Sequence, residues 1–242
     1  MEYDLLARWL VAVSLLGLAG LPIAARLFPR ADGRGAGLAL PVALGVLTLV
    51  AYYVGHLAYP LPAVAAGLLV LASLAALAGL DRDALRGGRL AVAPDLDVDR
   101  RRVAEVAAVF LAAYLFVLGL RVLDPAVHAI GGEKYLDFGL LQSLARADAL
   151  PPEDVWFAGE PVSYYFGGHL ASHLLATLAG TPPRFAYNLA LPTFYAALVA
   201  GTYDLAGAVA ASRGRSARLA GATAAFFVGV AANLSTAGRL LV

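Results

Sequence analysis

Residues 61–80 read LPAVAAGLLVLASLAALAGL, a run of apolar side chains without a single charge. An α-helix needs about 20 such residues to cross the hydrocarbon core of a bilayer. The sequence YPLP at 59–62 predicts a tight turn at the start of this run, and the stretch before it, 38–59, is apolar as well. We therefore expect two antiparallel transmembrane helices in this part of the chain.

The rest of the chain has the same character. Of its 242 residues, 61% are hydrophobic and 14% are charged, against about one quarter charged in a soluble domain. This composition predicts an all-α, polytopic transmembrane helical bundle that forms a single domain over 1–242, in a cell membrane and in contact with its lipid. The chain stops just after the last apolar run, so we expect an N-terminal fragment or one module of a longer protein. About seven spans are expected: 6–27, 38–59, 61–80, 103–123, 164–180, 186–211 and 217–237.

Several classes of function are excluded by what the sequence lacks. There is no cysteine, which excludes disulfides and thiolate metal sites. The sequence also has no glycine-rich phosphate-binding loop, no nucleophile elbow and no basic patch interleaved with aromatic residues. No nucleic-acid partner is therefore expected.

Arginine residues in the loops predict the orientation, because cytoplasmic loops are enriched in basic residues. The loop after the first span carries three arginines and the loop after the third carries six; they are Arg26, Arg30 and Arg34, then Arg82, Arg86, Arg89, Arg100, Arg101 and Arg102. Placing both loops in the cytoplasm puts the N-terminus and the long segment 124–163 outside. The loop after the sixth span, with Arg213, Arg215 and Arg218, would then also be external, against the rule.

The external segment 124–163 is acidic. It contains seven of the seventeen acidic residues, against only Lys134 and Arg146. Long loops between spans are often functional. Within this one, the sequence GGEKYLDFGLLQSLAR at 131–146 predicts an amphipathic juxtamembrane helix that lies along the membrane surface.

Two carboxylates of this helix are candidates for catalysis. Glu133 and Asp137 lie four residues apart, so they share one helix face. Such a pair could bind a metal ion or accept a proton from an incoming hydroxyl. The alternative is a solvated helix start, in which Lys134 pairs with Asp137.

Tyrosine and histidine residues follow at the start of the fifth expected span. Tyr164 and Tyr165 either anchor the helix at headgroup level or line a site for a lipid phosphate or a sugar. His169 and His173 have metal-ligand spacing but lack the Glu of a zinc-protease motif. They are therefore either metal ligands or structural residues that form hydrogen bonds across helices.

The acidic helix and the segment after it carry a resemblance to a known family. The residues are GGEKYLDFGLLQSLARADALPPEDVWFAGEPVSYYFGGHL, from Gly131 on, followed by GTPPRFAYNLALPT. This stretch resembles the archaeal and chlorobial YYY membrane proteins, a family of unknown function. The tyrosine triplet that names the family is Tyr164-Tyr165-Phe166 here, which implies that the third hydroxyl is dispensable or not chemical.

That family is similar, more distantly, to the GT-C superfamily of glycosyltransferases, whose donors are polyprenyl-phosphate-linked sugars. The resemblance implies that Glu133 or Asp137 deprotonates the acceptor or binds a divalent metal, and it leaves the need for a metal open. It also implies a substrate-binding group, which consists of Lys134, Glu160, Tyr164, Tyr165 and His169. The chain departs from those transferases in two ways. The acids are spaced E-x-x-x-D instead of adjacent, and four expected spans precede the loop.

Two alternatives to the enzyme stay open. The chain could be a non-catalytic membrane protein that uses the acidic loop for docking. It could also be a transporter module with Asp204, His169 and His173 as polar groups that converge inside the membrane. Asp204 is costly in lipid, so it is expected to face the bundle interior or water, or to lie at a helix end near Arg213 and Arg215.

Overall fold

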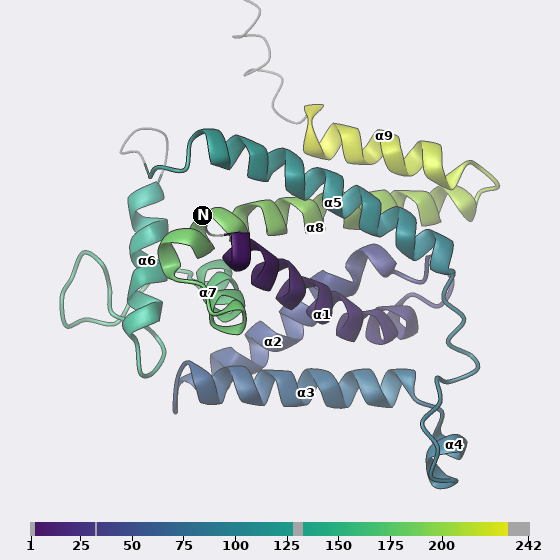
Figure 1. Cartoon of the computed structure of the whole chain (residues 1–242), viewed down its shortest axis with the longest axis horizontal. Coiled ribbons are helices and arrows are strands. Elements are labelled where there is room, and N and C mark those ends of the chain that lie inside the picture. The colour runs from purple at the N-terminus through teal and green to yellow at the C-terminus, as the bar shows by residue number, and fades with distance from the viewer. Residues whose placement is uncertain (1–2, 32, 128–132, 232–242) are drawn as a thin grey trace, which may run out of the picture.

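The computed structural model describes residues 3–31, 33–127 and 133–231, and every regular element within them is a helix (Figure 1). Five helical stretches are long and apolar enough to cross a membrane, which confirms the prediction of an all-α, multi-pass membrane protein. They are α1 (Tyr3–Leu27), η1 (Ala36–Leu38) together with α2 (Ala39–Gly55), α3 (Leu61–Gly79), α5 (Arg100–Leu123) and α8 (Pro183–Ala211). The shorter helices are α4 (Arg82–Arg86), α6 (Lys134–Arg146), α7 (Gly167–Ala179) and α9 (Ala217–Gly229).

The expected fifth span over 164–180 is not confirmed. Helix α7 has 13 residues, about 20 Å at 1.5 Å per residue, against a hydrocarbon core of about 30 Å. Figure 1 shows it end-on while α1, α3 and α5 run lengthwise, so it lies across the spans. Gly180 ends the helix with φ 59°, and its carbonyl oxygen accepts a hydrogen bond from Arg8 near the start of α1, at 3.4 Å. Helix α7 therefore covers one end of the bundle.

The expected seventh span over 217–237 begins as α9, whose 13 residues run antiparallel to α8. The Tyr195 hydroxyl of α8 donates to the carbonyl oxygen of Gly229 at 2.9 Å. The part of the expected span from 232 on lies outside the described residues. A seventh crossing is therefore not confirmed.

Because α7 does not cross, all three arginine-rich segments lie at one end of the bundle, at the right in Figure 1. Arg218, at the start of α9, pairs with Glu105 near the start of α5. Arg26, at the end of α1, pairs with Asp95, whose backbone carbonyl also accepts a hydrogen bond from Arg34 at 3.1 Å. The expectation that the loop after the sixth span lies opposite the six-arginine loop is therefore corrected. We call this end the arginine-rich end and the opposite one, which carries α6, the α6 end.

A buried ion pair joins α5 to α8 close to the arginine-rich end. Arg102 Nε donates to Asp204 Oδ1 at 3.2 Å, and both side chains are almost fully buried. The backbone N–H of Gly37 donates to Asp204 Oδ2 at 3.0 Å. Asp204 faces the bundle interior, as one of the two predictions had it, but its partner is Arg102 and not Arg213 or Arg215.

Helices α1 and α2 approach each other closely at Gly20. This glycine is buried, and a Cβ atom there would collide with the backbone carbonyl of Ala39. Small residues allow such close approach of helix backbones in membrane proteins. Gly17, one turn earlier, has no neighbouring atom within 4 Å of an added Cβ.

We expect Gly20→Ala to lower the free energy of unfolding by about 1–3 kcal/mol, the usual cost of overpacking a tight contact. Gly17→Ala in the same helix is the matched control and is expected to be neutral or slightly stabilising, because alanine favours the helix. Thermal unfolding of both purified variants in one detergent measures the difference. Equal melting temperatures for the two variants would contradict the close α1–α2 contact.

Candidate functional site

Helix α6 lies crosswise at the α6 end of the bundle (Figure 1). Its apolar face, with Leu140, Leu141 and Leu144, is buried, as the amphipathic pattern predicts. Glu133 occupies the position before the first helical residue, and its carbonyl oxygen accepts the N–H of Asp137 at 2.9 Å. The two acidic side chains therefore sit one helical turn apart, and each contacts a side chain of the segment 164–169.

Glu133 contacts a pair of tyrosines. The Tyr164 hydroxyl donates to Glu133 Oε2 at 3.1 Å, and the Tyr164 and Tyr165 hydroxyl oxygens are 2.6 Å apart. Their rings stack with centroids 4.0 Å apart. The hydrogen bond with Tyr165, partial desolvation and the Glu133 carboxylate raise the pKa of Tyr164 above its ordinary value, so it remains a hydrogen-bond donor at neutral pH.

Asp137 contacts the histidine of α7. His169 Nε2 is 3.0 Å from Asp137 Oδ1, and the carboxylate is the more exposed of the two groups, at 41% against 19%. The second ring nitrogen of His169, Nδ1, is buried without a hydrogen-bond partner among the described residues. A carboxylate that holds one histidine nitrogen sets the orientation of the ring.

The Asp137–His169 pair borders a hollow of about 240 Å³ between α6, α7 and α8. Its polar lining comes from this pair, Ser172 and Tyr187, and the rest is apolar. One of the apolar residues, Leu191, is 51% exposed on α8, which is one of the five candidate spans. The hollow therefore connects a titratable pair with a surface of α8 that faces lipid if the helix spans the bilayer.

The other two predicted binding residues, Glu160 and Lys134, do not line the hollow beside Asp137 and His169. Glu160 and Tyr164 both line a neighbouring hollow of about 450 Å³, together with the exposed side chains of Trp156 and Phe157. Lys134 forms no ion pair with Asp137 among the described residues, where the partner of Asp137 is His169. The solvated Lys134–Asp137 pair is thus not what the structure contains.

The two histidines of α7 have separate partners. His173 is buried and forms a hydrogen bond with the Tyr59 hydroxyl, whereas His169 contacts Asp137. Each histidine therefore forms a hydrogen bond to another segment of the chain, as expected if the two are structural residues. No group of three or more His, Asp or Glu side chains that could hold a metal ion occurs in the described parts of the chain. The described residues thus bring no such cluster together, and no step is assigned to a metal.

Sequence reasoning missed two residues of this end. Tyr59, the partner of His173, belongs to the YPLP turn, and Tyr187 belongs to the quoted GTPPRFAYNLALPT stretch. No helical or strand spacing along the sequence relates either tyrosine to Glu133 or Asp137. Only the fold brings Tyr187 to the hollow beside Asp137 and His169.

A model of a family of uncharacterized membrane proteins, DUF2298, matches residues 46–242. The chain belongs to the DUF2298 family. The DUF2298 match begins inside α2 and includes Glu133, Asp137 and every side chain that contacts them, while α1 lies outside it. No curated protein and no solved structure matches the chain. Membership in DUF2298 supports the resemblance to a membrane family of unknown function and carries no activity with it.

The site of this DUF2298 protein has the parts that general acid–base chemistry requires. Asp137 is a carboxylate that is oriented by a histidine and still partly open to solvent. Glu133 is held by the two tyrosines one helical turn away. A hydroxyl substrate could therefore reach a proton acceptor in the hollow next to α8.

Proposed function

We propose that this DUF2298 protein is a membrane glycosyltransferase of GT-C-like architecture. It transfers a sugar from a polyprenyl-phosphate donor to an acceptor hydroxyl at the α6 end, which faces the outside of a cell membrane. The observation that carries the proposal is the Asp137–His169 pair, because it borders a hollow whose α8 side is a candidate span. A lipid-linked donor needs its reactive group at headgroup level and its chain in the bilayer.

The distribution of arginine supports this orientation. All three arginine-rich segments belong to the end opposite α6, and basic residues favour the cytoplasmic side. With five spans, α1 enters from outside, and α5 returns the chain to the outside before α6. The loop that contradicted the rule in the seven-span arrangement now agrees with it.

In the proposed reaction, Asp137 takes the proton of the acceptor hydroxyl. The acceptor oxygen forms a bond to the anomeric carbon, while the bond from that carbon to the phosphate oxygen breaks and the lipid phosphate leaves with its electron pair. His169 donates to Asp137 and keeps the carboxylate oriented. Glu133, Tyr164 and Tyr165 form a hydroxyl-rich wall that would bind the sugar, with Lys134 and Glu160 at its periphery.

The transporter alternative predicts that Asp204, His169 and His173 converge inside the membrane. Their hydrogen-bond partners do not support this arrangement. Asp204 is hydrogen-bonded to Arg102 and to the backbone of Gly37. His169 is hydrogen-bonded to Asp137, and His173 to Tyr59.

The direct test of the transferase is an assay with membranes that contain the full chain and an isoprenoid-phosphate-linked radiolabelled sugar. Label transfer to a hydroxyl acceptor is the expected result, and no transfer from any such donor would refute the proposal.

The orientation is testable because the chain has no cysteine, so single cysteines can be introduced cleanly. We expect Ala158→Cys, at the α6 end, to react with a membrane-impermeant maleimide in intact cells. Ala91→Cys and Ser212→Cys, both exposed at the arginine-rich end, are expected to react only after permeabilisation. Labelling of Ser212→Cys but not Ala91→Cys from outside would restore the seven-span arrangement. Labelling of both from outside, with Ala158→Cys protected, would remove the basis for an external site.

A further inference from the structure

A groove of about 670 Å³ lies at the α6 end between α1, α5 and α8. It is formed by the first turns of α1 and α8 and the last turn of α5, which meet at this end of the bundle. Most of the lining side chains are apolar; among them are Leu6, Leu118, Val122, Phe185 and Leu189. An apolar groove at the ends of three candidate spans lies at the depth where lipid headgroups meet acyl chains.

Two guanidinium groups line this groove, and no acidic side chain lines it. Arg121 donates to the side-chain oxygen of Asn188 at 2.7 and 2.9 Å, which fixes the guanidinium without neutralising it. Arg184 is exposed, and its guanidinium carbon lies 4.8 Å from the ring centroid of Phe185. Neither arginine forms an ion pair among the described residues. The groove therefore carries two positive charges that favour the binding of an anion.

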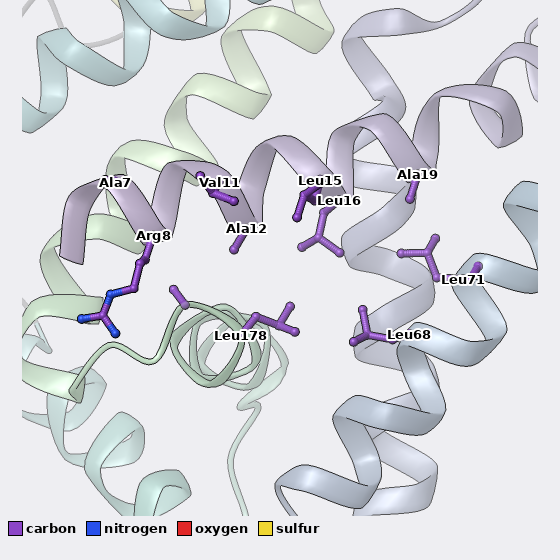
Figure 2. A pocket seen from close by; sticks show the side chains of 12 residues that line it. Ala7, Arg8, Val11, Ala12, Leu15, Leu16, Ala19, Leu68, Leu71 and Leu178 are labelled. Atoms are coloured by element: carbon purple, nitrogen blue, oxygen red, sulfur yellow. The ribbon is translucent and has the colours of Figure 1, made fainter. Parts of the chain in front are cut away.

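A second apolar groove, between α1, α3 and α7, provides the comparison (Figure 2). Figure 2 shows one guanidinium at its end, that of Arg8, and apolar side chains such as Leu68 and Leu71 along the rest. Arg8 is paired with Asp4 at 3.0 Å and also donates to the carbonyl oxygen of Gly180. Its charge is therefore already compensated.

We propose that the groove between α1, α5 and α8 binds an anionic phospholipid, with the phosphate between Arg121 and Arg184 and the first methylenes of the chains against the apolar wall. The site is independent of the proposed transferase, because Asn188 and Leu189 lie on this side of α8 while Tyr187 and Ala190 line the other hollow.

The test measures thermal unfolding of the purified full chain in a neutral detergent with added phosphatidylglycerol, phosphatidylcholine or glycerol phosphate. We expect phosphatidylglycerol to raise the melting temperature at the lowest concentration. Arg184→Gln should raise the concentration needed by roughly fivefold, the equivalent of about 1 kcal/mol. Among the described residues, this variant loses the contact with Phe185, so it is expected to fold.

Arg8→Gln is the matched control, because it removes an arginine from the other groove at the same end, and it should leave the phosphatidylglycerol effect unchanged. Equal stabilisation by phosphatidylcholine would overturn the proposal, as would an equal effect of Arg8→Gln. Stabilisation by glycerol phosphate alone would mean a site for a free anion and would overturn the lipid assignment. None of these outcomes depends on sugar transfer.

Discussion

Asp137→Asn is expected to lower the rate of sugar transfer by about 10²–10⁴-fold, the usual contribution of a general base. Asparagine keeps an oxygen that accepts the hydrogen bond from His169, which is 3.0 Å from Asp137 Oδ1 in the native protein. It cannot take a proton from the acceptor hydroxyl. The geometry of the site is thus preserved while its chemistry is removed, and initial rates with a saturating lipid-linked donor measure the loss.

The matched control is Asp148→Asn, an exposed acid of the same loop whose carboxylate the proposed mechanism does not use. It should transfer sugar at close to the native rate. Glu133→Gln is expected to act mainly on the apparent affinity for the sugar, because Glu133 contacts Tyr164 and not His169. Native activity in Asp137→Asn, or an equal loss in Asp148→Asn, would rule out Asp137 as the base.

Asp204→Ala is expected to lower the free energy of unfolding by about 3–5 kcal/mol, the cost of removing one partner of a buried ion pair. The substitution removes the buried carboxylate from Arg102, whose side chain is only 6% exposed, and leaves it with Glu105 at 3.4 Å as its remaining acidic partner. The N–H of Gly37 also loses its acceptor. Reversible denaturation of the purified protein in mixed micelles measures the change.

Two further variants separate burial from charge. Asp95→Ala removes the exposed pair with Arg26 and should cost less than about 1 kcal/mol, because surface pairs contribute little. The double variant Arg102→Met/Asp204→Leu replaces the buried pair with apolar side chains and should recover most of the stability lost in Asp204→Ala. If Asp95→Ala and Asp204→Ala cost the same, the pair between α5 and α8 does not hold the bundle together.

Five of the seven expected spans agree with helices of the structure within a few residues; 103–123, for example, became α5 (Arg100–Leu123). Transmembrane helices are predictable from long apolar runs, because about 20 consecutive apolar residues fit few structures other than a helix that crosses the bilayer. The run 164–180 is not confirmed as a span, and the ambiguity has a physical reason. A buried helix and a lipid-facing helix have the same composition, and seven of the 13 residues of α7 are buried within the protein.

The candidate site was only partly visible in the sequence. The spacing of Glu133 and Asp137 predicts one shared helix face, and the quoted motif contains the tyrosines and His169 that contact them. The contact of Tyr59 with His173 and that of Arg102 with Asp204 join residues more than 100 positions apart. No local periodicity relates such residues, so no sequence pattern could pair them.

The sequence by itself determined the class of protein, because hydrophobicity is a property of composition and a helix is a local structure whose hydrogen bonds lie within one segment. It also determined the acidic amphipathic helix, whose period is local as well. Only the tertiary structure decided that α7 turns back across one end of the bundle. That choice depends on how the spans pack around it, and it places the arginine-rich segments together and α6 opposite them.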